Sequence, residues 1–173
     1  MSPDVDGDGV LVFGGGGSQL ALRGETWRMN STTPASIAPY GSACRGSSGA
    51  PELRAIDGFR PWLGQWFGVR VASVPQRSSA VLLLGLSRDA WGAVPLPLAL
   101  DLVGAPGCSL LCSLDTALAM QGGGGDATWE IAICDCANGI GRHFYVQAAV
   151  IDPGWNALGV VFSNGLDGVL GRL

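Results

Sequence analysis

The chain has 173 residues, of which 47% are hydrophobic and only 14% are charged, so it is long and apolar enough to fold around a core and is not a charge-rich disordered segment. Its 10 basic residues are all arginine, which excludes a catalytic or phosphate-binding lysine. The net charge is −4 and the arginines are scattered singly, so nucleic acid is not expected as a partner.

The acidic start of the chain has the opening of a calcium loop. Asp4, Asp6 and Asp8 alternate with other residues, and alternate carboxylates can converge on one hard cation. The acidic residue that would complete such a loop is replaced by Val12 or Gly15, depending on the loop type. Calcium is therefore expected only as an optional cofactor, and a solvated acidic terminus is the alternative.

Residues 1–33 are predicted to form a β-hairpin segment. An apolar strand at residues 10–13 and a second strand near residues 25–29 flank a tetraglycine. An isolated hairpin is marginal in water, and Val10, Val12 and Phe13 are too apolar to remain solvated. These three residues are expected to pack on the chain's own sandwich or to add to the sheet of another copy.

Residues 34–39 are predicted as an extended linker, because they hold two prolines and no turn motif. The domain that follows, residues 40–173, is rich in short apolar runs bounded by Gly, Pro, Ser, Asn or Asp, which is typical of strands and tight turns. Helical periodicity is confined to residues 116–121. The pattern predicts an all-β, antiparallel two-sheet sandwich of jelly-roll or Greek-key type. The expected strands are residues 66–72, 80–86, 96–102, 108–113, 127–133, 143–151 and 157–163.

Five cysteines indicate disulfides and an oxidising, extracellular or cell-surface location, since their spacings do not fit a zinc site. Cys134 and Cys136 would face the same side of a strand and are poorly placed to bond each other. One of them, taken as Cys136, is therefore expected to pair with Cys112. The chain starts without a secretory signal, so it is expected to be trimmed or a fragment, and it holds no apolar run long enough to span a membrane.

Catalytic machinery is not expected. The only histidine, His143, is predicted on the polar face of a strand with Tyr145 and Gln147, and the sequence contains no nucleophile elbow. Several acidic residues, including Asp152 and Asp167, stand in turn contexts where Asp serves its own backbone. These features favour a protein that is not an enzyme.

The six tryptophans are the remaining signal. Trp91 and Trp129 are flanked by apolar strand residues and are predicted to lie in the core. Trp62, Trp66 and Trp155 are candidates for stacking on sugar rings, as in many secreted sandwiches that bind polysaccharide. Packing or burial in an interface is the alternative for these three residues.

Two segments resemble known families. Val-Leu-Val-Phe-Gly-Gly at residues 10–15, followed by Glu-Thr-Trp at 25–27, resembles the last part of a kelch repeat, in a single copy. From Tyr40 onward the chain resembles Gly-rich, Cys-containing β-sandwich modules at the C-terminal ends of large secreted bacterial proteins. The matching motifs include Tyr-Gly-Ser-Ala-Cys at 40–44, Leu-Leu-Leu-Gly-Leu-Ser at 82–87, Pro-Gly-Cys at 106–108 and Asp-Pro-Gly at 152–154.

The second resemblance implies secretion and a disulfide between Cys44 and Cys108. Together with the residue patterns, it leads us to expect a non-catalytic extracellular structural or adhesion module. Such a module would form a homo-oligomer or polymer, or join a parent surface protein, by β-strand addition. The alternative is a carbohydrate-binding module that holds a polysaccharide on exposed tryptophans.

Overall fold

The computed structural model describes residues 2–3, 9–16, 22–30, 33–122 and 124–173, with side chains from residue 33 onward. The chain divides into two compact units, Met1–Thr33 and Pro34–Leu173, and each is described by itself. The first unit is a three-stranded antiparallel sheet of β1 (Ser2–Pro3), β2 (Gly9–Gly16) and β3 (Leu22–Asn30), with β2 in the centre. It contains the expected pair of strands and adds a short third one.

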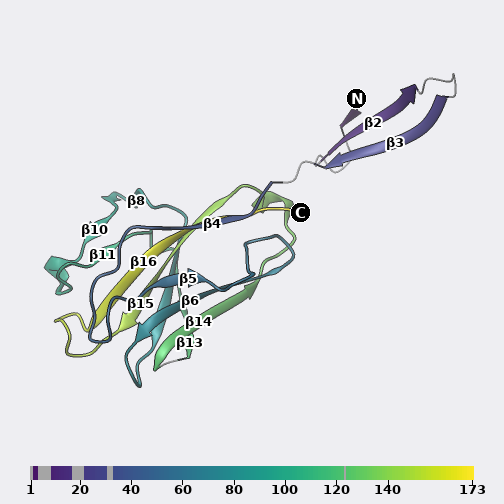
Figure 1. Cartoon of the computed structure of the whole chain (residues 1–173). Helices are drawn as coiled ribbons and strands as arrows, with labels where there is room; N and C mark the ends of the chain where they lie inside the picture. The colour runs from purple at the N-terminus through teal and green to yellow at the C-terminus, as the bar shows by residue number, and fades with distance from the viewer. Residues whose placement is uncertain (1, 4–8, 17–21, 31–32, 123) are drawn as a thin grey trace. The chain divides into compact units, whose positions relative to one another are not determined.

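The second unit is built on two large antiparallel sheets, with two further two-stranded ones, so the predicted all-β sandwich is confirmed (Figure 1). The five-stranded sheet has the order β12-β7-β15-β16-β4, and the four-stranded sheet has the order β13-β14-β6-β5. The strands of the first sheet are β12 (Thr116–Ala119), β7 (Ala80–Gly85), β15 (His143–Ile151), β16 (Val160–Val169) and β4 (Ser36–Tyr40). Those of the second are β13 (Gln121–Gly122), β14 (Gly125–Ala132), β6 (Trp66–Val74) and β5 (Leu53–Ala55).

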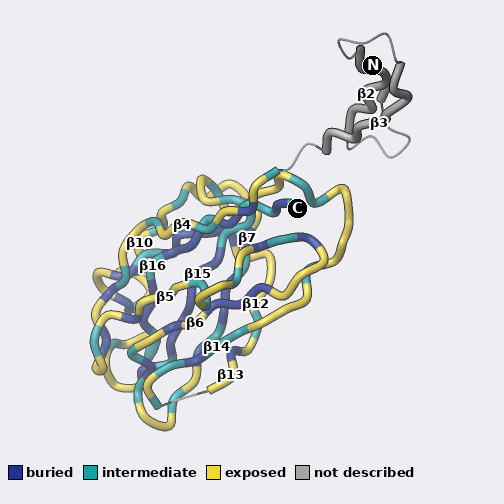
Figure 2. Tube along the Cα trace, turned by 45° about the vertical axis from the view of Figure 1, so that its right-hand side comes forward, coloured by how far each residue is buried: buried dark blue, intermediate teal, exposed yellow. Residues whose placement is uncertain are grey.

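The core lies between the two sheets and follows from alternation along the strands (Figure 2). In β6, Phe67, Val69 and Val71 are buried while Arg70 is exposed, as the period-2 pattern of this segment predicts. The facing strands supply Leu82 and Val146, both fully buried. The apolar residues of the two inner faces therefore form one core cluster.

The chain closes both long sides of the sandwich. On one side it crosses from β12 to β13 at the buried Met120, whose N–H donates to the carbonyl of Ala80 at 3.0 Å. On the other side the amide of Asn164, in β16, accepts from the N–H of Leu53 at 2.9 Å and donates to its carbonyl at 3.1 Å. The edge of the short strand β5 is thereby tied to the opposite sheet.

Two segments differ from their sequence prediction. The expected linker contains β4, which pairs with β16 over Ser36–Tyr40, so the second unit begins at Pro34. An edge strand tolerates Pro39 because only one of its sides must supply hydrogen bonds. Residues 116–121 belong to β12 and β13 and do not form a helical turn. Strand β12 pairs with β7, with Leu118 opposite Leu82, and this tertiary pairing overrides the weak local preference for a helix.

Between β7 and β12 the chain leaves the sheet and covers part of its outer face. This excursion contains β8 (Ala90–Trp91), β9 (Val94–Pro95), β10 (Leu98–Ala99), the 3₁₀-helix η1 (Asp101–Val103) and β11 (Ser109–Leu110). The strands predicted at 96–102 and 108–113 are thus reduced to two-residue pairs. Leu100, Leu110 and Leu111 of these runs are buried although they do not extend a large sheet, whereas Leu102 is fully exposed.

The covered outer face buries the Gln147 side chain completely. Its Oε1 accepts from the N–H of Leu111 at 3.0 Å, and its Nε2 donates to the carbonyls of Ser109 at 2.9 Å and Ser163 at 2.8 Å. The face of β15 that was predicted to be polar is therefore open to solvent only at the His143 end of the strand. Gly85 permits this close cover, because a Cβ there would lie 2.2 Å from the carbonyl oxygen of Ser113.

The disulfide expectations are half correct. Cys44 and Cys108 are bonded, with Cα atoms 4.8 Å apart. The expected bond between Cys112 and Cys136 is wrong, since Cys134 pairs with Cys136 and Cys112 is free and buried. Strand β14 ends at Ala132, so the same-side rule for i and i+2 does not apply to the two neighbouring cysteines. The 3₁₀-helix η2 (Ala137–Gly139) follows directly.

Candidate functional site

The outer face of the four-stranded sheet carries the charged groups most favourable for binding. Arg54 of β5 and Arg70 of β6 are directly opposite each other in the register. A guanidinium nitrogen of Arg54 lies 2.6 Å from Glu52 Oε1, and Arg70 Nε lies 2.6 Å from Asp126 Oδ2. All four side chains are largely solvent-accessible, so these ion pairs contribute little to stability and remain available to a ligand.

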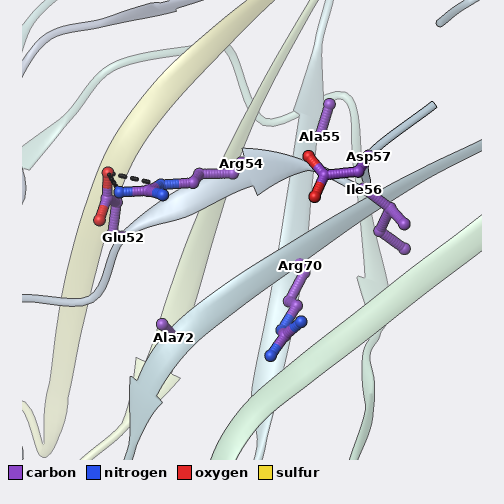
Figure 3. A pocket seen from close by; sticks show the side chains of 7 residues that line it. All are labelled: Glu52, Arg54, Ala55, Ile56, Asp57, Arg70 and Ala72. Atoms are coloured by element: carbon purple, nitrogen blue, oxygen red, sulfur yellow. Dashed lines mark hydrogen bonds and ion pairs between the residues drawn. The ribbon is translucent and has the colours of Figure 1, made fainter. Parts of the chain in front are cut away.

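A shallow pocket of about 410 Å³ lies over this face (Figure 3). Figure 3 shows Glu52 and Arg54 paired at one end, the carboxylate of Asp57 at the other, and the guanidinium of Arg70 below them. The pocket therefore offers both hydrogen-bond donors and acceptors. The residues that line it are Glu52, Arg54, Ala55, Ile56, Asp57, Arg70 and Ala72.

Trp66 belongs to the same face as the pocket. It is the first residue of β6, at even spacing from Arg70, so the two side chains leave the same side of the strand. The Trp66 side chain is 59% exposed. An exposed indole can stack on a sugar ring. Trp66 does not line the pocket, because Gly68 lies between it and Arg70 on this face and is covered by Ile56, Phe59 and Glu130.

The other tryptophans do not join Trp66 in one platform. Trp62 is half-buried in the turn before β6, where its backbone bridges to Gly171. Trp155 is 46% exposed, but it lies in the turn after β15. The N–H of Ile151, the last residue of β15, donates to the carbonyl of Ser79, which follows the end of β6 opposite to Trp66. Nine residues of strand, about 25 Å at roughly 3.3 Å per residue, separate the two ends.

The prediction that Trp91 lies in the core is wrong. Its side chain is 41% exposed, because it stands in the two-residue ribbon of β8 and β9 on the excursion. Trp129 of β14 is partly buried and packs against the core.

A second group of side chains, the polar–aromatic cluster, consists of Tyr40, Arg88, His143, Tyr145 and Asp167. His143 Nδ1 lies 2.8 Å and Arg88 Nη1 lies 3.4 Å from the Asp167 carboxylate. The Arg88 guanidinium also lies over both tyrosine rings, at 5.8 and 6.0 Å from their centroids, and His143 stacks on Tyr145. Asp167 is thus part of a strand and pairs with His143, whereas the sequence predicted a turn role for it.

Electrostatics keep the two phenols of this cluster protonated. Burial, with smaller contributions from Cys112 and Asp167, raises the pKa of Tyr40 well above its ordinary value, and Arg88 opposes the shift only in part. Burial and Asp167 also raise the pKa of Tyr145. The Tyr40 hydroxyl donates to the carbonyl of Leu111 at 2.9 Å, which fixes the ring against the excursion.

The remaining predicted site residues fall into two groups. Asp4, Asp6 and Asp8 lie outside the described residues, and so do the side chains of Val10, Val12 and Phe13, although the backbone of these last three belongs to β2. Within the described ranges no group of three or more His, Cys, Asp or Glu residues could hold a metal ion. Over the same ranges no helix is long and apolar enough to cross a membrane.

Asp152 has a structural role near its predicted turn. Its buried carboxylate accepts from the N–H and the hydroxyl of Ser47, each at 2.7 Å, and so ties the turn after β15 to the loop beyond Cys44.

The free thiol of Cys112 is expected to be unreactive in the folded chain. It is fully buried, and this burial, with a smaller contribution from Asp115, raises its pKa to about 12. At about pH 8 only about one thiol in ten thousand would be ionised, and the thiolate is the reactive form. We expect a thiol reagent to leave the native chain unlabelled and to label one cysteine per chain in denaturant. Stoichiometric labelling without denaturant would contradict the buried position.

Comparison of the chain with protein-family models, with curated proteins and with solved structures found no match. The site therefore stands on its own geometry. Alternation in β6 could have placed Trp66 and Arg70 together on the outer face. The sequence pattern did not indicate Arg54 as a site residue, because its strand is only three residues long and comes shortly after a proline.

Proposed function

We propose that this chain is a non-catalytic extracellular structural or adhesion module that self-associates through its N-terminal unit. The observation that carries the proposal is the three-stranded sheet of residues 2–30, a separate compact unit that lacks any cysteine. Units below about 40 residues usually need disulfides, metals or oligomerisation to be stable. A sheet this small therefore gains stability when another sheet joins it.

The edge strand β3 supplies the means of joining. It is nine residues long, contains no proline and, among the described residues, pairs only with β2. Its register places Val10 opposite Met29 and Val12 opposite Trp27, so four neighbouring positions on one face of the sheet are apolar. A strand of another copy could continue the sheet with main-chain hydrogen bonds at the edge of β3, and the apolar faces of two sheets could pack on each other.

The edge strands of the second unit are less suited to the same reaction, and two of them, β12 and β13, have only four and two residues. Strand β4 contains Pro39 and β5 has only three residues, whereas β3 has nine residues and no proline. Short length and proline are among the features by which native sheets avoid edge-to-edge pairing. This contrast supports association through residues 2–30 and not through the sandwich.

An extracellular location is supported by the disulfides Cys44–Cys108 and Cys134–Cys136, because such bonds persist in oxidising compartments. The partner in this proposal is a second copy of the chain or a parent surface protein that offers a strand. Calcium at Asp4, Asp6 and Asp8 would be optional in either case.

Light scattering after size exclusion tests the proposal. The full chain should run as an oligomer of its 17.7 kDa protomer, and a chain beginning at Pro34 should be monomeric, because the second unit has its own core and both disulfides. Replacing Val12 by lysine in the full chain should shift it toward the monomer, while Ser36→Lys, on the sandwich edge, should not. A full chain that stays monomeric at high concentration would contradict self-association.

Carbohydrate binding is a second candidate function, favoured by the exposed Trp66 on the same outer face as the pocket of Arg54 and Arg70. Trp66→Ala should weaken binding at least about tenfold, equivalent to about 1.4 kcal/mol, and Arg70→Ala should weaken it similarly. Trp155→Ala is the matched control and should leave affinity unchanged, because Trp155 lies at the other end of the sandwich. Calorimetric titration with cellulose, chitin, xylan and β-glucan fragments measures the effect; no heat with any of them removes this candidate.

A further inference from the structure

The two disulfides differ sharply in their access to solvent. Cys44 and Cys108 are 6% and 2% exposed and belong to the core cluster. Cys134 and Cys136 are both exposed to solvent, in the loop between β14 and η2. An external thiolate can therefore reach Cys134 and Cys136 without any opening of the fold.

The Cys134–Cys136 bond also contributes little to holding the chain together. It joins residues only two apart, whereas Cys44 and Cys108 are 64 apart. The constraint that a disulfide places on the unfolded chain grows with the length of the loop it closes. Breaking the short loop should thus leave the fold in place.

Backbone hydrogen bonds fix the flanks of this loop independently of the disulfide. The N–H of Ile133 donates to the carbonyl of Gln65 at 2.9 Å, and the N–H of Gly64 donates to the carbonyl of Ile133 at 3.0 Å. On the other flank the N–H of Gly139 donates to the carbonyl of Cys136 at 2.9 Å. The two sulfurs would therefore stay near each other after the bond is broken.

We propose that Cys134 and Cys136 form an exchangeable disulfide that takes up an external cysteine thiol as a mixed disulfide. The incoming thiolate attacks one sulfur and forms a new S–S bond, and the other cysteine leaves as a thiolate. That thiolate can attack the mixed disulfide and release the incoming thiol, which restores the original bond. If a second external thiol attacks instead, the external thiols are oxidised to a disulfide and Cys134 and Cys136 are reduced by two electrons.

The position of the loop suits a thiol carried on a peptide. Trp66 is directly opposite Ala132 in the register of β6 and β14, two residues before Cys134, and its exposed ring offers an apolar contact there. Asp135, between the two cysteines, lies 3.4 Å from Arg172 in an ion pair, which reduces the repulsion that its carboxylate would exert on an incoming thiolate.

Thiol mapping of the native full chain tests the proposal. Incubation with reduced glutathione, followed by acid quenching, should show reduction of Cys134–Cys136 and a trapped glutathione adduct on one of its sulfurs at least about a hundredfold faster than Cys44–Cys108 is reduced, because the buried bond reacts only after opening. The circular dichroism spectrum and Tm should barely change. Loss of Cys44–Cys108 at the same rate, or no adduct before unfolding, would overturn the proposal.

Two further arms make the result specific. A peptide with a single cysteine, used in place of glutathione, should give the same adduct if the site accepts protein thiols; reaction with glutathione alone would restrict it to small thiols, and reaction with neither would refute it. In Cys136→Ser, glutathione disulfide should produce a stable adduct on Cys134, since no neighbouring thiolate can expel it. The Cys134→Ser, Cys136→Ser double variant should give none, and an adduct on the double variant would assign the reaction to another cysteine.

Discussion

Replacing both Cys44 and Cys108 by alanine is expected to lower the free energy of unfolding by about 4 kcal/mol, the largest effect of any change proposed for this chain. The bond closes a loop between residues 64 apart, and in the chain-entropy view its loss frees a long segment of the unfolded chain. It also joins the excursion, at Cys108, to the segment that follows β4. The N–H of Cys44 donates to the carbonyl of Phe162 at 3.0 Å, so this segment is in turn bound to β16.

Equilibrium unfolding in urea measures the loss. The matched control is Cys134→Ala with Cys136→Ala, which removes an equal number of sulfur atoms but closes a loop of only three residues, and should cost about 1.5 kcal/mol or less. Equal losses for the two double variants would show that loop length does not govern the contribution of these bonds.

Gln147→Leu is expected to lower the free energy of unfolding by about 3 kcal/mol or more. The leucine fits the volume approximately but leaves the N–H of Leu111 and the carbonyls of Ser109 and Ser163 without their partner. A buried polar group without a partner costs about 1–3 kcal/mol. The same variant should loosen the excursion, which hydrogen exchange at the Leu111 amide would reveal.

Gln121→Leu is the control for Gln147→Leu. Gln121 is exposed in β13, so the same chemical change there should alter the free energy of unfolding by less than about 0.5 kcal/mol. A Gln147→Leu chain as stable as the natural one would mean that the excursion is held by its apolar contacts and the disulfide alone.

The long strands could be predicted from sequence because each is either an alternating or a continuous apolar run bounded by turn residues. Residues 66–72 show the alternation most clearly, with Phe67, Val69 and Val71 inward and Arg70 outward, and 143–151 coincide with β15. The short strands could not be predicted in this way. Three residues of β5 carry no measurable period, and the single proline of β4, Pro39, suits an exposed edge strand as well as a linker.

The buried outer face around Gln147 was beyond prediction for a different reason. Alternation places His143, Tyr145 and Gln147 on one face, and a polar face is ordinarily exposed to solvent. Only the tertiary path of the excursion covers Gln147 and leaves His143 open. The cysteine assignment failed at a similar point, since nothing in the sequence showed that β14 ends before Cys134.

The candidate site was predicted in part. The sequence singled out Trp66 but grouped it with Trp155, and only the course of the chain shows that the turn after β15 lies at the opposite end from the start of β6. The pairing of Arg54 with Arg70 depends on register between strands that are separated by a long loop, which local patterns do not encode.

The antiparallel pairing of β4 with β16 determines how the second unit would respond to a pulling force. Ser36 lies opposite Val169, so the entry and exit of this unit are at the same end of adjacent strands. Tension between Pro34 and Leu173 would load the hydrogen bonds of β4 one after another, as in opening a zipper, and not all at once in shear. The Cys44–Cys108 bond would stop this peeling, after residues 34–43 had released at most about 35 Å of chain at roughly 3.5 Å per residue. A module of this kind, held between two partners, would lengthen at low force and then become stiff while its core remained folded.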